Sequence, residues 1–450
     1  MNLFCSKSRL ISPRFTSNLT RAIGKNWLNL KDVEPMDKRI KKGQEFISQY
    51  VDANDIEKAE GITYLTKHLS VDFEKMNDAI KVYQRNPNIQ SSKDVYISSR
   101  PEYMKLFQSL ANVPEGIQFL CNFRADLIKL LKTQAQTSPG ELSHLIRMDL
   151  VLKDMLTNWF SLSNLSLQRV TWDSSASLIQ KLVSKEAVHP AKGLIDVKRR
   201  MGDNRRCFIF VHSAMPDEPL IVVYVALMNK IADNVQEIVK GMDLVEKNEL
   251  TTANYYSISS LQDGLKGIDL GNLLIKSVVR ELQKEAPKVR LHSTISPIPG
   301  FRNWLLRCLH GNSNFEILDQ KSIILLKGAN FETSDLSKLS KELIILIESN
   351  SLDVYEQFKD FLMHSCARYI CDARTLSSNF PINPVAHFHL HNGAQVYRLN
   401  WRGNTNSRGI EQSCGLMVNY FYDIEKVQEN SAKYINNKTV HISDKVRNLL

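Results

Sequence analysis

The sequence predicts an α+β protein in which an all-α region comes first and a mixed α/β region follows. Between residues 32 and about 157, apolar residues recur at spacings of three and four, which is the pattern of one buried helix face. Beyond residue 166, runs of β-branched and aromatic residues alternate with helical segments. A glycine-containing stretch separates one such run from a helix, which is typical of a layered domain whose ligand lies where strand ends meet a helix.

The N-terminal region is predicted to be a helical bundle over residues 32–160. One apolar stripe consists of Ile62, Leu65, Leu69, Phe73, Met76 and Ile80, and a second of Phe119, Phe123, Leu127, Leu130 and Leu131. A further helix is expected to begin at residues 138–141, where serine, proline and glutamate form an N-cap signature. Because no catalytic set of residues occurs here, the bundle is expected to serve packing within or between subunits.

The polar stretch 161–166 marks the predicted start of the second domain, residues 161–450. Helices are expected at 235–239 and 270–284. Strands are expected at 169–172, 207–211, 220–227, 255–258, 289–295 and 322–326.

Composition limits the functions that fit this chain. With 43% hydrophobic and 24% charged residues, the 450-residue chain has the composition of a soluble globular protein. The net charge of +10 includes six basic residues in the first 31, so the remainder carries +4. Such a surplus suits a small acidic ligand and does not predict nucleic-acid binding. The longest apolar run, 220–228, is too short for a membrane span, which needs about 20 residues.

The seven cysteines are scattered and contain no Cys-x-x-Cys pair, so we expect neither a disulfide framework nor a metal site. Residues 1–31 lack acidic residues and are rich in serine, arginine and asparagine. This composition is typical of a mitochondrial transit peptide, although a basic tail without a targeting role would show the same bias.

Glycines at 264, 267 and 271 follow one predicted strand and precede the helix at 270–284. Glycine lets backbone N–H groups approach a phosphate closely, and a helix N-terminus adds partial positive charge. The spacing matches neither a dinucleotide fingerprint nor a Walker loop, and glycine-rich turns that only cap a helix are at least as common. The basic residues Lys198, Arg199, Arg200, Arg205 and Arg206 could contact phosphates, or could lie on a solvated hairpin.

Two further stretches carry candidate catalytic groups. Ser296 ends an apolar run and is followed by Pro297 and Pro299, which fix the backbone behind its hydroxyl. His389 lies in the run Phe388-His389-Leu390-His391-Asn392-Gly393-Ala394, and His387 and His391 would share its face if this segment were a strand. A serine before proline is often only a turn residue, and a histidine in a strand is often structural.

Together these stretches resemble the malonyl-CoA decarboxylase family. The resemblance rests on residues 262–271, 293–301 and 384–394, and it extends from about Thr171 to Tyr422 through His189-Pro190, the basic run, Glu218-Pro219-Leu220 and Asn400-Trp401. It implies a C-terminal catalytic domain of the GNAT acetyltransferase fold, a homotetramer, and conversion of malonyl-CoA to acetyl-CoA and CO2.

The resemblance also implies the site residues. Ser296 and His389 take the catalytic positions, with Asp269 as a supporting acid where the family often has glutamate. Substrate binding is implied for Ser296 and His389 and for the loop Lys266, Gly267, Ile268, Asp269, Leu270, Gly271 and Asn272. No cofactor is expected, because the thioester itself accepts the electrons. The chain ends without the Ser-Lys-Leu of peroxisomal members, which favours the mitochondrial matrix.

Two other functions stay open on sequence grounds. An acyl-CoA-dependent acyltransferase would use the same loop, and a catalytically silent scaffold would use only the helical region. Thioester hydrolysis is disfavoured, because there is no Gly-x-Ser-x-Gly elbow and Pro297 lacks the N–H that such elbows use in the oxyanion hole. Which of Ser296 and His389 delivers the proton, and whether other malonyl thioesters are accepted, is not decided by the sequence.

Overall fold

The computed structural model describes residues 19–20, 36–137, 142–186, 188–191, 193–241 and 249–450. Apart from residues 19 and 20, the predicted transit peptide lies outside the described residues, as does the predicted helix start at 138–141. The chain divides into two compact units. The first comprises Met1–Ser166, Val211–Leu220 and Gln262–Asp269, and the second comprises Leu167–Phe210, Ile221–Leu261 and Leu270–Leu450.

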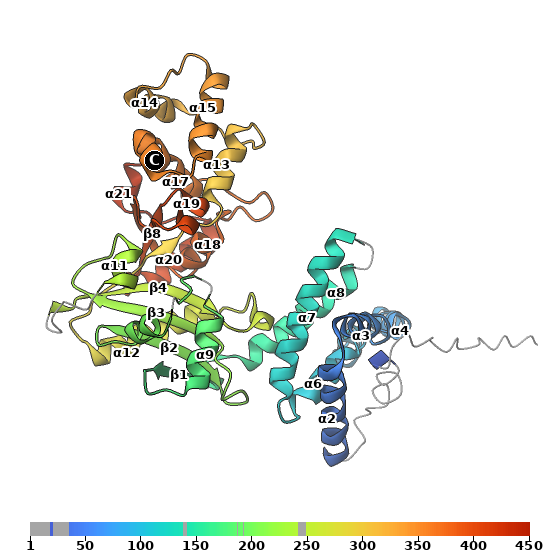
Figure 1. Ribbon diagram of the computed structural model, residues 1–450. Coiled ribbons are helices and arrows are strands. Elements are labelled where there is room, and N and C mark those ends of the chain that lie inside the picture. Colours follow the sequence, from blue (N-terminus) through green and yellow to red (C-terminus); the bar gives the residue numbers. More distant parts are fainter. Residues whose placement is uncertain (1–18, 21–35, 138–141, 187, 192, 242–248) are drawn as a thin grey trace, which may run out of the picture. The chain divides into compact units, whose positions relative to one another are not determined.

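The first unit is helical, as the apolar periodicity predicts (Figure 1). Its helices are α2 (Met36–Asp52), α3 (Asp55–His68), α4 (Phe73–Arg85), α5 (Ile89–Ser98), α6 (Tyr103–Ala111), α7 (Gly116–Thr137) and α8 (Leu142–Trp159), followed by the 3-10 turn η3 (Leu162–Asn164). Phe119 and Phe123 of α7 pack against Phe46 and Tyr50 of α2 in a buried aromatic cluster. This cluster forms the centre of the helical core.

The predicted stripe from Ile62 to Ile80 is divided between two helices. Helix α3 ends at His68, and Asp72 caps the start of α4 by accepting a hydrogen bond from the Lys75 backbone N–H. The α3 residues of the stripe are buried, whereas Phe73 is 58% exposed and α4 buries none of its residues. The periodicity therefore predicts the helices correctly but not the break between them.

The second unit is built on a mixed sheet. The strands are β1 (Leu165–Val170), β2 (Arg205–His212), β3 (Ile221–Met228), β4 (Thr252–Ser260), β5 (Leu291–Thr294), β6 (Ser296–Pro297), β7 (Gln395–Asn400) and β8 (Met417–Phe421). Their order within the described residues is β1-β2-β3-β4-β5-β8-β6, with β7 paired to β8. Strands β2, β3 and β4 are antiparallel neighbours, and β4 and β5 are parallel.

Helices connect and flank these strands. Before β5 they are α9 (Ala176–Ser184), α10 (Leu194–Arg200), α11 (Val235–Lys240) and α12 (Leu270–Glu285), with the 3-10 turn η5 (Asp263–Leu265). After β6 they are α13 (Phe301–Leu309), α14 (Gln320–Gly328), α15 (Leu336–Glu348), α16 (Leu352–Tyr355), η6 (Glu356–Phe358), α17 (Lys359–Cys371), α18 (Pro384–His391), α19 (Ser407–Ser413), α20 (Val427–Asn437) and α21 (Asp444–Arg447). Helix α12 forms the crossover from β4 to β5 and packs on β3.

The fold class predicted from the sequence is confirmed: an all-α region precedes a mixed α+β domain. One predicted strand is wrong, because residues 322–326 lie in α14. Asp319 caps that helix by accepting a hydrogen bond from the Ser322 backbone N–H at 2.8 Å, and an apolar run of five residues fits a helix as well as a strand. The late strands β7 and β8 were not predicted.

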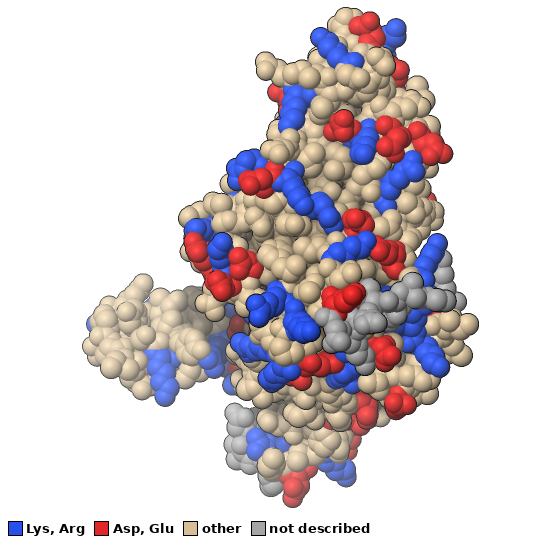
Figure 2. All heavy atoms as spheres, turned by 90° about the vertical axis from the view of Figure 1, so that its left-hand side faces the viewer, with Lys and Arg blue, Asp and Glu red and all other residues tan. Residues whose placement is uncertain are grey.

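Acidic and basic side chains are intermixed on the face drawn in Figure 2, without one dominant basic region. Among the described residues, no helix combines the length and apolarity that crossing a bilayer requires. The centre of the sheet is buried, since every residue of β2 and all but the last of β3 are buried.

Candidate active site

Ser296 lies where the chain stops pairing with β4 and begins to pair with β8. Strand β5 pairs with β4 up to Tyr255 and Thr294, and the chain then passes to β6, where Ser296 pairs with Val418 of β8. The following loop is fixed through the Pro299 carbonyl, which accepts hydrogen bonds from the Tyr369 hydroxyl at 2.9 Å and the Asn383 side chain at 3.0 Å. The proline-braced serine therefore lies on a constrained segment.

The loop turns into α13 at Gly300, whose φ is +81°. A side chain there would be strained, because L-residues rarely adopt this conformation. The turn ends the extended segment that carries Ser296 and lets the helix start at Phe301.

His389 lies on a helix, not on a strand. Helix α18 begins at Pro384, and its N-cap Asn383 accepts a hydrogen bond from the Ala386 backbone N–H at 2.8 Å. The strand alternative for 384–394 is thus wrong, since Pro384 is the first residue of a helix that runs to His391. His387 and His391 are one helical turn apart, with ring centroids at 5.9 Å, so they share a face. His389 points elsewhere and is 3% exposed.

The structure brings Ser296 and His389 together. The Ser296 Oγ lies 3.1 Å from His389 Nε2, and it donates a hydrogen bond to Thr294 Oγ1 at 2.9 Å. On the other side of the ring, His389 Nδ1 lies 2.8 Å from the Tyr422 hydroxyl. The four groups form a continuous buried chain of hydrogen bonds, and each residue is no more than 6% exposed.

The strand β8 supplies the support for this chain. The Tyr420 ring stacks on the His389 ring with centroids 4.4 Å apart, and the Tyr420 backbone N–H donates to Thr294 Oγ1 at 3.1 Å. Asn419 donates to the Thr294 carbonyl at 2.7 Å. Sequence reasoning missed Thr294, Tyr420 and Tyr422, although Thr294 lies inside the stretch that carries the resemblance.

Burial sets the charge state of the pair. Loss of solvation lowers the pKa of His389 to about 3, so the imidazole is neutral at physiological pH. A neutral imidazole has one donor and one acceptor nitrogen. Because the single Ser296 hydroxyl hydrogen goes to Thr294, Nε2 carries the ring proton and donates to Ser296, and Nδ1 accepts from Tyr422. This polarity favours delivery of a proton to Ser296 over removal of one.

The glycine loop belongs to the first unit up to Asp269. Gly267 has φ +79°, while Gly264 is required by packing, since a Cβ there would lie 1.8 Å from the Cys121 carbonyl oxygen. The loop is held by the buried Arg124, which donates to the Gly264 carbonyl at 2.6 Å and the Lys266 carbonyl at 3.0 Å. No sequence pattern pointed to Arg124.

The remaining loop residues differ in exposure. Lys266, Gly267 and Asp269 are exposed, and Ile268 is half-buried. Leu270, Gly271 and Asn272 form the first turn of α12 in the second unit, and Asn272 is half-buried. A Cβ on Gly271 would lie 2.6 Å from the ring of Phe388, the neighbour of His389. The structure thus joins Ser296 and His389 within the second unit, whereas Asp269 belongs to the first unit.

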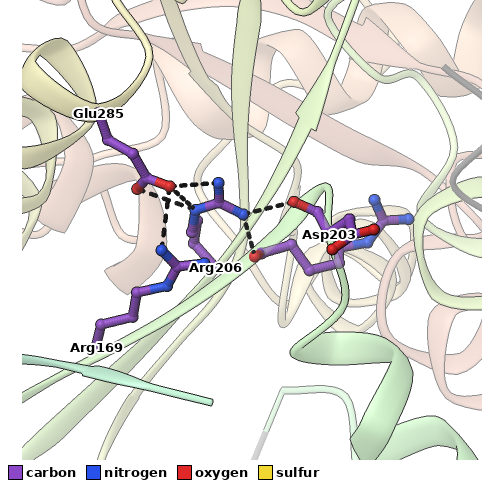
Figure 3. A network of polar contacts seen from close by, with 5 residues as sticks. Arg169, Asp203, Arg206 and Glu285 are labelled. Carbon is purple, nitrogen blue, oxygen red and sulfur yellow. Dashed lines mark hydrogen bonds and ion pairs between the residues drawn. The ribbon is translucent and has the colours of Figure 1, made fainter. Parts of the chain in front are cut away.

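The basic run is not a solvated hairpin. Arg200, Arg205 and Arg206 are each at most 8% exposed. Arg206 donates to both oxygens of Glu285, at 2.9 and 3.1 Å, and Arg169 contacts the same carboxylate (Figure 3). Burial of Glu285 opposes ionisation, but hydrogen bonds and charge from Arg206 outweigh it and lower the pKa of this carboxyl. The Arg206 guanidinium is therefore paired with Glu285 within the fold and is not available to bind a phosphate.

Among the described residues, no group of three or more histidine, cysteine or acidic side chains is placed to hold a metal ion. The six described cysteines are buried and free, and burial raises the pKa of their thiols.

The fold and the site define an α+β protein with a neutral hydroxyl–imidazole pair buried beside the point where two parallel strands part. The family model described as "Malonyl-CoA decarboxylase C-terminal domain" matches residues 163–450, and the model described as "Malonyl-CoA decarboxylase N-terminal domain" matches residues 69–160. The chain belongs to the malonyl-CoA decarboxylase family.

Individual relatives agree with this assignment. The chain is 40% identical over 367 residues to the mitochondrial malonyl-CoA decarboxylase of Anser anser anser, covering 80% of this chain and 71% of the relative. It is 39% identical over 360 residues to that of Mus musculus, covering 78% and 71%. The crystal structure of malonyl-CoA decarboxylase from Agrobacterium vitis superposes with a TM-score of 0.81 at 27% identity, covering 96% of this chain and 99% of that one.

Proposed function

We propose that this chain is a carboxy-lyase that converts malonyl-CoA to acetyl-CoA and CO2, with Ser296 and His389 as its catalytic pair. Membership of the malonyl-CoA decarboxylase family supports the substrate and the reaction. The observation that supports the catalytic pair most directly is the 3.1 Å contact between the Ser296 hydroxyl and the neutral His389 imidazole.

The reaction breaks the bond between C2 and C3 of the malonyl group. The electron pair of that bond moves into the thioester to give an enolate, and CO2 leaves from C3. The enolate oxygen needs hydrogen bonds while it forms, and C2 then needs a proton. One proton from solvent is therefore consumed in each turnover, and no oxidant or reductant is required.

Ser296 and His389 can supply that proton as a relay. The Ser296 hydroxyl gives its hydrogen to C2, His389 Nε2 returns one to Ser296, and the Tyr422 hydroxyl replaces the ring proton at Nδ1. Water then restores Tyr422. The hydrogen-bond polarity described above favours this direction, and the depressed pKa of His389 keeps its ring in the neutral form that can both donate and accept.

We infer that Lys266, Gly267, Ile268, Asp269, Leu270, Gly271 and Asn272 bind the CoA part of the substrate. The positive φ of Gly267 and the start of α12 at Leu270 support a role in holding the diphosphate, because backbone N–H groups at a helix start favour an anion. Asp269 precedes that helix and is proposed as a supporting acid.

The remaining proposals concern the whole chain. The relatives in goose and mouse carry the name mitochondrial, so we infer a mitochondrial location, with the matrix as the compartment and residues 1–31 as the transit peptide. Residues 32–160 are proposed to pack subunits into a homotetramer, and residues 161–450 to catalyse the reaction.

The test is an assay of the purified chain with malonyl-CoA, without added metal or nucleotide and in the presence of a chelator. We expect equimolar acetyl-CoA and CO2. A modified amine in place of free acetyl-CoA would instead support an acyltransferase. Ser296→Ala and His389→Ala are each expected to lower kcat by about 100-fold or more, the range of general acid–base contributions.

Matched controls lie next to both residues. Ser293 is a buried serine of β5 whose hydroxyl donates to the backbone carbonyls of Thr294 and Tyr420. His387 lies on another face of α18, with its Nδ1 2.8 Å from the Tyr434 hydroxyl. Ser293→Ala and His387→Gln are expected to keep kcat within a few-fold of the wild type. Equal losses in the controls and in the catalytic variants would refute the assignment of the pair.

A further inference from the structure

A pocket of about 650 Å³ lies within the second unit, beside the loop that follows Ser296. Pro297 and Pro299 of that loop form part of its wall, whereas neither Ser296 nor His389 lines it. The rest of the wall comes from the segment 188–191, from α10, from α11 and from the segment 404–412. An occupant of this pocket is therefore separate from the acyl group on which the catalytic pair is proposed to act.

Arg200 gives the pocket a hydrogen-bond donor that has no partner. The residue is 4% exposed, and its Nε and Nη2 bond to Asp196 at 3.3 and 3.1 Å. Its Nη1 is also buried, but it has no hydrogen-bond partner among the described residues. Because a buried guanidinium N–H is normally satisfied, this group indicates a ligand oxygen that carries negative charge.

His189 gives the pocket an acceptor. The residue is 8% exposed, its ring donates a hydrogen bond to the Tyr256 backbone, and its Nε2 is buried without a partner in the described structure. Burial and the charges of Arg200 and Arg408 lower the pKa of His189 to about 4, so the ring is neutral and carries one proton. Since that proton is on the nitrogen bonded to Tyr256, Nε2 needs a ligand group that donates.

The segment that carries His189 is fixed to the sheet. One carboxylate oxygen of Glu186 accepts hydrogen bonds from the backbone N–H groups of Val188 at 2.7 Å and His189 at 3.0 Å. The same oxygen accepts from the Ser257 hydroxyl of β4 at 2.8 Å. The acceptor nitrogen is thus held in place before any ligand binds, which lowers the entropic cost of binding.

The remaining lining is cationic and apolar. Lys240 and Arg408 also line the pocket, and within the described part of the chain no lining residue is acidic. The apolar wall consists of the two prolines with Val188, Val235 and Val239. The volume lies in the range of pockets for small organic ligands, about 300 to 1,000 Å³. A ligand with a carbon skeleton therefore matches the pocket better than a bare inorganic anion.

We propose that this pocket, called the acid pocket below, binds a small hydroxy acid, an organic carboxylate with an apolar skeleton and a free hydroxyl group. The carboxylate accepts a hydrogen bond from Arg200 Nη1, and the hydroxyl donates one to His189 Nε2. The skeleton lies against the valine and proline side chains. A hydroxyl keeps its hydrogen at neutral pH, whereas an ionised carboxylate has none to donate. The acid pocket adds a binding function to the proposed decarboxylase activity and does not depend on it.

Calorimetry of the full-length chain with two acids tests the proposal. Each enantiomer of 2-hydroxy-4-methylpentanoate carries both polar groups, and 4-methylpentanoate lacks only the hydroxyl. We expect one enantiomer to bind about 5- to 10-fold more tightly than 4-methylpentanoate, because without the hydroxyl a buried acceptor stays unsatisfied. Saturating acetyl-CoA should leave both affinities within about twofold, since the acid pocket excludes the catalytic pair.

Variants separate the two contacts. Arg200→Gln should weaken both acids about 10- to 100-fold, as for loss of one charge-assisted hydrogen bond. His189→Phe should abolish the difference between the two acids and keep the affinity for 4-methylpentanoate within about threefold. Arg206→Gln is the matched control, because Arg206 is a buried arginine that is paired with Glu285 and does not line the pocket. It should leave both affinities unchanged.

Equal binding of the two acids to the wild type, or binding of neither, would overturn the proposal. Tighter binding of inorganic phosphate than of the hydroxy acid would show a phosphate site and would overturn it too. Displacement of the hydroxy acid by acetyl-CoA would make the pocket part of the CoA site, with the same consequence. If a variant does not fold, the comparison of the two acids on the wild type still decides. None of these measurements depends on release of CO2, so failure of the proposed function would be seen separately.

Discussion

His389 and Tyr422 are linked through the ring nitrogen that faces away from Ser296, at 2.8 Å between Nδ1 and the phenol oxygen. The ring is thereby oriented from both sides, and the tautomer that presents Nε2–H to Ser296 is favoured. In this respect Tyr422 occupies the position that a carboxylate holds in hydrolytic triads, but it brings no negative charge.

Removal of the phenol hydroxyl tests this orienting role. We expect Tyr422→Phe to lower kcat about 10-fold and to leave KM for malonyl-CoA nearly unchanged, since the ring keeps its place but loses the partner of Nδ1. Steady-state kinetics measure the effect. Tyr397→Phe, on β7, serves as the control, and a Tyr422→Phe enzyme with wild-type kcat would exclude the relay through Nδ1.

Replacement of Thr294 by valine removes the hydroxyl but keeps the shape of the side chain. Thr294→Val leaves the Ser296 hydroxyl and the buried Tyr420 N–H without their acceptor, so we expect a kcat about 10-fold lower and a free energy of unfolding about 1–3 kcal/mol lower. Thr294→Ser restores the acceptor and should recover most of both quantities. Urea unfolding and turnover measured on the two variants check the prediction. Similar values for valine and serine would contradict it.

The pKa of His389 makes stability depend on pH. The folded-state pKa is about 3 and the ordinary value is 6.5, so the unfolded chain binds the extra proton between these values. Stability therefore rises with pH from about 3 to 6.5 and is fully present above 6.5. As the pH falls from 6.5 to 5, one such group lowers the free energy of unfolding by about 2 kcal/mol. His389→Gln should remove that share of the pH dependence, measured by urea unfolding at pH 5 and 7.5. An identical slope in both proteins would contradict the assignment.

Gly271 is expected to be essential for the placement of α18. A methyl group there would lie 2.6 Å from the Phe388 ring, which must then move together with its neighbour His389. We expect Gly271→Ala to lower kcat several-fold or more. Gly328→Ala is the matched helical control, since nothing lies within 4 Å of its added Cβ, and it should be neutral or slightly stabilising. Full activity in Gly271→Ala would show that the ring can shift without affecting His389.

The constrained backbone at Ser296 could be predicted from the sequence because it depends on neighbouring residues. Two prolines and an apolar run restrict this segment regardless of distant residues. The family resemblance pointed to His389, and its segment fitted a strand as well, because a histidine occurs at every second position. The structure instead places it on a helix that Asn383 caps. The strand predicted at 322–326 was wrong for a related reason, because a short apolar run does not distinguish a strand from a helix.

Local sequence patterns could not identify the hydrogen-bond partners of Ser296 and His389. Thr294 accepts a hydrogen bond from Tyr420 of β8, which lies 126 residues further along the chain, and no turn signal in the sequence predicts that strand. Arg124 and the Gly264 carbonyl are 140 residues apart. Such contacts depend on the packing of whole elements, which a single sequence does not specify residue by residue.

The Asn383 side chain performs two tasks at once: its oxygen starts the helix of His389, and its nitrogen holds the carbonyl behind Ser296. One amide group thereby ties the segment of Ser296 to the helix of His389. Loss of this amide would release both segments at the same time.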